Sequence, residues 1–156
     1  MCIRDRLCIG KKFGVNTGYA IKAISKYTPK NSRSQLIISK GINIILDAYN
    51  ANPTSMHEAI TAFSKRKGKK ALILGHMAEL GVYEAKEHKV LVKLVNTSKI
   101  ETCYWVGKPY KQYVSNNWFI SLSSLKNYLK SNPIDADEVL IKGSRSAKLE
   151  RIIGIL

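Results

Sequence analysis

The chain has 156 residues, of which 45% are hydrophobic and 24% are charged, which is ordinary for a globular domain. Its formal net charge is +15, from 26 Lys and Arg against 11 Asp and Glu, and this raises the expectation of an anionic partner. No apolar run reaches the roughly 18 residues of a membrane helix, and the charged start has no apolar core of a signal peptide. Membrane-spanning and secreted classes are therefore not expected.

Two segments precede the regular pattern. Residues 1–6, Met-Cys-Ile-Arg-Asp-Arg, match no periodicity after them, and we expect a non-native scar there. Residues 7–30 carry one helical pattern followed by a linker. A single helix cannot bury its own apolar face in water. We therefore expect the tail of a preceding domain, with Tyr19, Ile21 and Ile24 facing solvent.

From residue 31 onward, short apolar runs alternate with helical patterns. Only Lys40-Gly-Ile42 separates the first two runs, so an antiparallel hairpin is expected there. Strands that alternate with helices predict an α/β fold with a mostly parallel sheet covered on both faces. Six runs suit strands: Gln35–Ser39, Asn43–Leu46, Ala71–Leu74, Thr102–Val106, Trp118–Ile120 and Val139–Ile141.

Apolar residues at helical spacing predict four helices in this region. Ser55 and Glu58 have the spacing of a capping box at the start of the first helix. The apolar positions of the four helices lie within residues 56–63, 90–95, 122–129 and 149–156.

Three polar turns follow strands of this sheet, at residues 47–53, 75–81 and 142–146. Ligands bind at the carboxyl ends of the strands in such folds, so these turns are the candidate site. In the second turn, His76 and Glu79 could serve as acid–base groups, but glycine-bounded loops of this kind are common.

The first turn, Asp47-Ala-Tyr-Asn-Ala-Asn-Pro53, offers groups suited to a nucleotide. The Asp47 carboxylate can accept hydrogen bonds from the two hydroxyls of a ribose. Tyr49 offers a flat face and a hydroxyl. Asn50 and Asn52 each offer donors and an acceptor. An ordinary Asx turn that caps the next helix is the more common explanation for an isolated Asn-x-Asn-Pro pattern.

The third turn, Lys142-Gly-Ser-Arg-Ser146, combines cations with a glycine ahead of the expected last helix. Lys142, Ser144 and Arg145 could hold a carboxylate or phosphate together with free N–H groups of the helix start. The alternative is a serine N-cap beside exposed basic side chains.

Other chemistry is not indicated by the sequence. Cys2, Cys8 and Cys103 form no close pair, which fits a reducing compartment. The three histidines lack metal-ligand spacing, so no metal site is predicted. Neither the P-loop nor the Gly-x-Gly-x-x-Gly pattern is present, so no turn can cradle a triphosphate alone.

The three turns, in this order and at these distances, resemble the carboxyl-terminal domain of the Mur ligases, and most closely the branch that adds D-alanyl-D-alanine (MurF type). The most specific part is Tyr49-Asn-Ala-Asn-Pro53, and the resemblance covers about residues 7–156. It implies that residues 31–156 form a Rossmann-like domain. Residues 7–30 would be the end of the central ATPase domain and a linker.

The resemblance implies an ATP-dependent amide-forming ligase of peptidoglycan precursor synthesis. ATP and Mg²⁺ would convert the carboxylate of UDP-N-acetylmuramoyl-tripeptide to an acyl phosphate, which the amine of D-alanyl-D-alanine attacks. Other domains would hold the P-loop, most magnesium ligands and the UDP end. The chain alone would then be inactive, and the full protein would be a cytoplasmic monomer without nucleic-acid or membrane partners.

Individual roles follow from the same resemblance. Arg33 matches an arginine that reaches the γ-phosphate of ATP, a task suited to a guanidinium. Asp47, Tyr49, Asn50 and Asn52 match residues that line the nucleotide. The resemblance assigns Lys142, Ser144 and Arg145 to the incoming amino substrate.

One position departs from the family pattern, because His76 stands where the second motif usually has Asp. Two alternatives stay open at this point. The +15 charge would suit a stand-alone nucleic-acid-binding module, although its lysines are scattered. A small-molecule-binding module without catalysis would also fit the polar strand ends.

Overall fold

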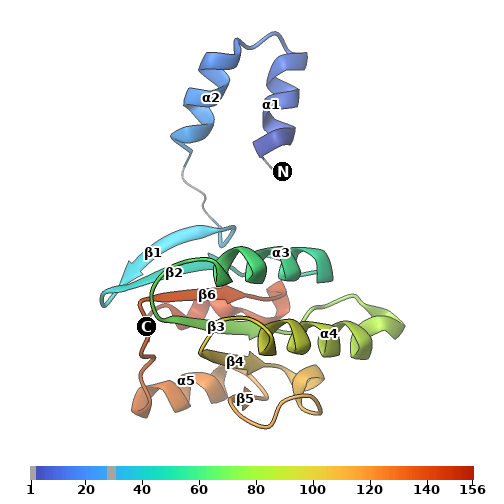
Figure 1. The fold of residues 1–156 in the computed structure, drawn as a ribbon, viewed down its shortest axis with the longest axis vertical. Coiled ribbons are helices and arrows are strands. Elements are labelled where there is room, and N and C mark those ends of the chain that lie inside the picture. Colours follow the sequence, from blue (N-terminus) through green and yellow to red (C-terminus); the bar gives the residue numbers. More distant parts are fainter. Residues whose placement is uncertain (1–2, 28–30) are drawn as a thin grey trace.

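The computed structural model describes residues 3–27 and 31–156, and within them one sheet has the strand order β1-β2-β6-β3-β4-β5 (Figure 1). Strands β1 and β2 pair antiparallel, and every other neighbouring pair is parallel. The predicted α/β class and the hairpin are therefore confirmed. The strands are β1 Gln35–Ser39, β2 Ile42–Asp47, β3 Lys70–Gly75, β4 Thr102–Val106, β5 Trp118–Phe119 and β6 Glu138–Lys142.

The hairpin turn has two residues, Lys40 and Gly41, with φ angles of 46° and 84°. Positive φ at both central positions is the geometry of the tight turns whose twist matches that of paired strands. The glycine takes this conformation without steric cost.

Helices cover both faces of the sheet (Figure 1). Helices α3 (Pro53–Ser64) and α4 (Glu84–Asn96) lie on one face. Helix α5 (Leu122–Ser131) and the short 3₁₀ turns η3 (Arg145–Ala147) and η4 (Leu149–Ile152) lie on the other. Two further 3₁₀ turns, η1 (Gly81–Tyr83) and η2 (Lys108–Tyr110), sit in connections.

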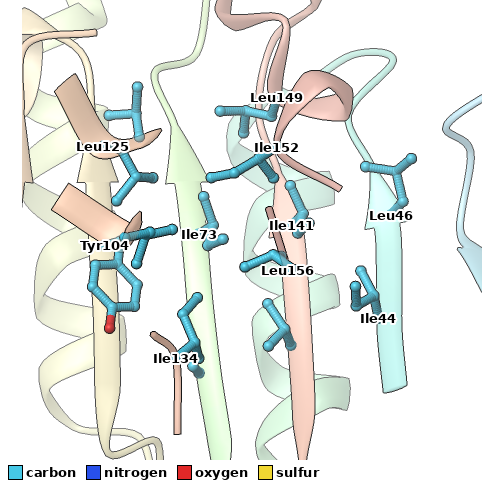
Figure 2. Close-up of a cluster of buried hydrophobic side chains, with 14 of the residues drawn as sticks. Ile44, Leu46, Ile73, Tyr104, Leu125, Ile134, Ile141, Leu149, Ile152 and Leu156 are labelled. Atoms are coloured by element: carbon cyan, nitrogen blue, oxygen red, sulfur yellow. The ribbon is translucent and has the colours of Figure 1, made fainter. Parts of the chain in front are cut away.

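The central strands are apolar on both sides, which explains their continuous hydrophobic runs. In β3, Ile73 packs on the α5 face, whereas Leu72 and Leu74 pack against α3 and α4. Figure 2 shows Ile73 and Ile141 pointing toward the same cluster, which includes Leu149. Alternating side chains of one strand thus supply two separate cores.

Two local predictions are wrong. The N-cap of α3 is Asn52, whose side chain accepts from the Ser55 amide, so the capping box is Asn52 with Ser55 rather than Ser55 with Glu58. Pro53 then occupies the first helical turn, where its missing N–H costs nothing. The predicted last α-helix is instead the pair η3 and η4, separated by Lys148 with φ 50°.

Residues 3–27 form two helices rather than the single one predicted, α1 (Ile3–Lys12) and α2 (Thr17–Ser25). The pair α1 and α2 stands apart from the sheet (Figure 1). Neither of the two helices has a buried residue. Tyr19 and Ile21 are 75% and 55% exposed, as expected, and Ile24 is partly exposed. Residues 28–30 of the predicted linker lie outside the described part. Of the described helices, none is long and apolar enough to cross a bilayer.

The connections define where a ligand can enter. The loops after β2 and β3 lead to α3 and α4 on one face, whereas the loop after β6 leads to η3 and η4 on the other. Because neighbouring loops diverge to opposite faces, the carboxyl ends beside β6 are where a ligand site is expected.

Candidate functional site

The three polar turns meet at the carboxyl edge of the sheet, around the end of β6. Asp47 and Lys142 are register partners in the β2–β6 pair, and Leu74 is the partner of Lys142 in the β3–β6 pair. The predicted gathering of these turns at one edge is therefore confirmed, although they are far apart in sequence.

On the β2 side of β6 lies an ion pair. Lys142 Nζ lies 2.5 Å from Asp47 Oδ2 and 3.5 Å from the carbonyl oxygen of Asn50. The Lys142 side chain is 2% exposed and that of Asp47 is 23% exposed. Asp47 Oδ1 also accepts from the Ser34 amide at 3.2 Å. A buried ammonium requires such a partner, so Lys142 is occupied with Asp47, while the carboxylate keeps exposed accepting capacity.

Two arginines lie close to the ring of Tyr49. The guanidinium carbon of Arg33 is 3.7 Å from the centre of the Tyr49 ring, and that of Arg145 is 5.2 Å away. A hydrogen bond from Arg33 and its charge, followed by the charge of Arg145, lower the pKa of the Tyr49 phenol. One ring thus holds a residue ahead of β1 and a residue after β6 close together.

An open pocket of about 400 Å³ adjoins this stack. Its lining combines a phenol, a guanidinium and a carboxylate, so the Tyr49 ring suits a flat ligand ring and the Arg145 side suits an anionic group of that ligand. The residues that line it are Asn31, Ser32, Ala48, Tyr49, Arg145 and Glu150.

Asn50 and Asn52 use their oxygens locally. Asn50 Oδ1 accepts from the Ala51 amide at 2.9 Å, and Asn52 Oδ1 accepts from the Ser55 amide at 2.8 Å. Both residues are exposed, and within the described chain neither Nδ2 donates to another group. The turn and cap interpretation therefore accounts for the oxygens, and the amide donors remain open to a ligand.

On the β3 side of β6, three side chains are linked. His76 Nε2 lies 3.1 Å from Ser146 Oγ, which in turn lies 2.9 Å from Ser144 Oγ. Ser144 is buried, Ser146 is exposed and His76 is partly buried. Desolvation, and secondarily the proximity of His88, lower the pKa of His76, while Glu84 opposes this shift. The imidazole is therefore neutral near pH 7.

Some of this arrangement was not predicted. Ser34 and Ser146 were not singled out, although Ser146 closes the motif that contains Ser144 and Arg145. The α-helix expected to begin there is absent, because η3 spans three residues, so the arginine rather than a helix start supplies the positive charge.

Two further features bear on ligands. Among the described residues, no group of three or more His, Cys, Asp and Glu side chains is placed to hold a metal ion.

A larger pocket of about 490 Å³ lies at the amino ends of β4 and β5, between residues 95–105 and 113–117. Because it lies away from the three turns, we assign it no part in the site.

Comparison with known sequences decides the family. The family described as "Mur ligase, glutamate ligase domain" matches residues 32–145, well over half of the chain. The chain belongs to the Mur ligase family. The matched segment includes the first two polar turns and the third turn as far as Arg145.

Relatives with an assigned name match over most of the chain. The UDP-N-acetylmuramoyl-tripeptide–D-alanyl-D-alanine ligase of Bacillus subtilis is 34% identical over 160 residues, covering 94% of the chain and 35% of that protein. The ligase of the same name from Treponema pallidum is 31% identical, covering 86% and 32%. The chain therefore spans about a third of the length of the curated relatives it matches.

Solved structures share the fold. MurF ligase from Thermotoga maritima in complex with ADP aligns with a TM-score of 0.79 at 21% identity, covering 96% of the chain and 35% of that protein. A MurF structure from Acinetobacter baumannii aligns with a TM-score of 0.74 at 24% identity, covering 94% and 34%. At these identities the likeness establishes the fold.

Proposed function

We propose that this chain is the carboxyl-terminal part of a cytoplasmic, monomeric, ATP-dependent ligase that joins D-alanyl-D-alanine to UDP-N-acetylmuramoyl-tripeptide in peptidoglycan precursor synthesis. The relatives that match most of the chain carry this name. The observation that carries the proposal is the stacking of Arg33 and Arg145 on Tyr49 beside the pocket.

Tyr49, which lines the pocket, and the neighbouring residues of the first turn fit a nucleotide. Tyr49 and the open Nδ2 donors of Asn50 and Asn52 suit a base and its sugar, and the exposed side of Asp47 suits hydroxyl groups. When bound, ATP with Mg²⁺ supplies the phosphoryl group that activates the substrate carboxylate. The described residues offer no metal-binding group of three, so we assign Mg²⁺ to the remainder of the ligase.

The arginines at this edge would bind the negatively charged groups of the substrates. Arg33 would donate in a fork to the phosphoryl oxygens of a bound nucleotide, where charge develops during transfer. Arg145 is exposed at the same ring and suits the carboxylate of the incoming dipeptide. Lys142, which is buried, acts by holding Asp47 and the Asn50 turn in place.

The chain alone should not catalyse the reaction. It has no phosphate loop in its sequence, and the apolar side chains of α1 and α2 are exposed as if a neighbouring domain covered them. Closure of this domain onto such a partner would exclude water and protect an acyl phosphate from hydrolysis.

The test is an assay of the full-length ligase that contains this chain. We expect it to convert D-alanyl-D-alanine and UDP-N-acetylmuramoyl-tripeptide to the pentapeptide product, with one phosphate released per amide bond. The 156-residue chain should form none. If the full-length protein forms no amide but binds DNA with an affinity that falls steeply with salt, the nucleic-acid-binding alternative replaces this proposal.

A further inference from the structure

The β3 side of β6 holds a chain of hydrogen-bonding groups that nucleotide binding does not use. His76 follows the last residue of β3, and Ser144 and Ser146 follow β6, so their side chains link the ends of the two strands. The Ser144 amide also donates to the His76 carbonyl oxygen at 3.1 Å. Backbone and side chains together therefore hold the imidazole against the second turn of the site.

Close packing fixes the orientation of the imidazole. A Cβ atom on Gly107 would lie 2.8 Å from His76 Nδ1, and Gly107 has φ 123°, a conformation that favours glycine. The Nδ1 side of the ring therefore lies close against Gly107, with no room for a side chain there. Its Nε2 points at Ser146, whose exposed hydroxyl is the outer end of the chain of groups.

We propose that His76 is the base that takes up a proton from the incoming amine, through Ser146, during amide formation. This inference rests on the proposed function, which requires an amine nucleophile at this edge. It adds a catalytic role to a residue that departs from the aspartate usual in the resembling motif. Arg145, between Ser144 and Ser146, would hold the carboxylate of the same substrate.

The proton balance is simple. The ammonium group of the dipeptide gives one proton to Ser146 Oγ, and the Ser146 hydroxyl gives its own proton to His76 Nε2, so that serine is unchanged and imidazole becomes imidazolium. The freed amine lone pair forms the C–N bond at the acyl phosphate. The C–O bond to phosphate then breaks, and phosphate leaves with that electron pair. The second amine proton passes to solvent.

The charge state of the surroundings suits this role. Desolvation and the neighbouring His88 keep His76 unprotonated before the reaction, and Glu84 on α4 moderates the shift in pKa. His88 is buried, with its Nδ1 on the Glu84 carbonyl oxygen and its Nε2 accepting from the Met77 amide. Both nitrogens of His88 are thus occupied, and His76 is the ring free to exchange a proton.

The experiment measures kcat against pH at saturating substrates in the full-length ligase. His76→Gln keeps a polar group near the Nε2 position but cannot take up a proton. We expect kcat to fall about 100-fold or more and the acid limb of the profile to disappear. His76→Asp restores a titratable base and should retain more activity, with its acid limb moved to lower pH. His57→Gln, on an exposed histidine of α3, is the matched control and should change neither quantity.

Ser146→Ala provides a second variant, at an exposed position. We expect a fall in kcat of about tenfold or more with the acid limb retained. The proposal is overturned if His76→Gln keeps kcat within threefold, or loses it equally at every pH with the limb unmoved. A wild-type ligase that forms no amide would instead refute the proposed function, and this inference with it.

Discussion

The two sides of β6 differ in kind. On the β2 side the contacts are charged: Lys142 pairs with Asp47, and Tyr49 stacks with two arginines. On the β3 side the contacts are neutral and tight: a Cβ on Gly143 would lie 2.8 Å from the Gly75 Cα. The first side suits anionic ligands, whereas the second holds two strand ends in close contact around one imidazole.

This difference predicts two classes of residue at the same edge: some stabilise the fold, and the others bind a ligand. The buried ion pair and the glycine contact should dominate stability. The exposed stack should contribute little to stability and much to binding.

Lys142→Met should have the largest effect on the isolated chain. Methionine keeps most of the side-chain volume but leaves the Asp47 carboxylate without its partner, at a cost of about 3 kcal/mol of unfolding free energy. Urea unfolding of the 156-residue chain measures this. Adding Asp47→Leu to the Met variant should recover at least half of the loss, since the unpaired charge is gone. A single variant as stable as wild type would show that the pair does not hold the β2 side together.

Gly143→Ala should come next, on the β3 side. Its Cβ would meet Gly75 backbone atoms and the Leu149 side chain at 2.8–3.0 Å. Backbone cannot move aside cheaply, so we expect a loss of about 2 kcal/mol. Gly154→Ala is the matched control, because nothing lies within 4 Å of its Cβ, and it should change stability by less than about 0.5 kcal/mol. Equal behaviour of the two variants would contradict tight packing between β3 and β6.

The pH dependence of the free energy of unfolding should depend on His88 of α4. Desolvation lowers the pKa of buried His88 in the folded chain, so unfolding takes up a proton as the pH falls below the unfolded value of about 6.5. Stability is therefore complete above that pH and declines below it. His88→Gln should reduce the loss of unfolding free energy between pH 7.5 and 5.5, whereas His57→Gln should not. An unchanged slope in the His88 variant would refute this assignment.

Tyr49→Ala should have the smallest effect on stability. An exposed cation–π stack contributes about 0.5–1 kcal/mol, and the ring covers little of the core. In the full-length ligase the same variant should raise the KM for ATP about tenfold, because both arginines lose their common support. Tyr49→Phe keeps the ring and should restore most of the affinity. A large loss of stability with unchanged KM would place Tyr49 with the residues that hold the fold.

Much of the fold could be predicted from the sequence. Central strands buried on both faces are continuous apolar runs, so each was found to within two residues. The last segment was misassigned because Leu149 and Ile152 are spaced three apart, which a 3₁₀ turn satisfies as well as an α-helix does. The left-handed conformation of Lys148, which ends η3, has no local signal in the sequence.

The site was harder to predict because its contacts are long-range. From its local sequence, Lys142 would be expected to be an exposed cation. Its burial is explained by its ion pair with Asp47, which is 95 positions away in the sequence. His76 and Ser146 are 70 positions apart. Local patterns located the three turns, but only the parallel pairing of β2, β6 and β3 determines which of their side chains touch.

The most direct test of the central claim is the rate of amide formation in the full-length ligase with Arg33→Ala. Arg151 is exposed and, within the described chain, its side chain makes no hydrogen bond, ion pair or ring contact, so Arg151→Ala is the matched control. If this edge completes an ATP-dependent ligase, Arg33→Ala should lower kcat about 100- to 1,000-fold, and Arg151→Ala should stay within twofold of wild type. Two variants with equal rates near that of wild type would contradict the account.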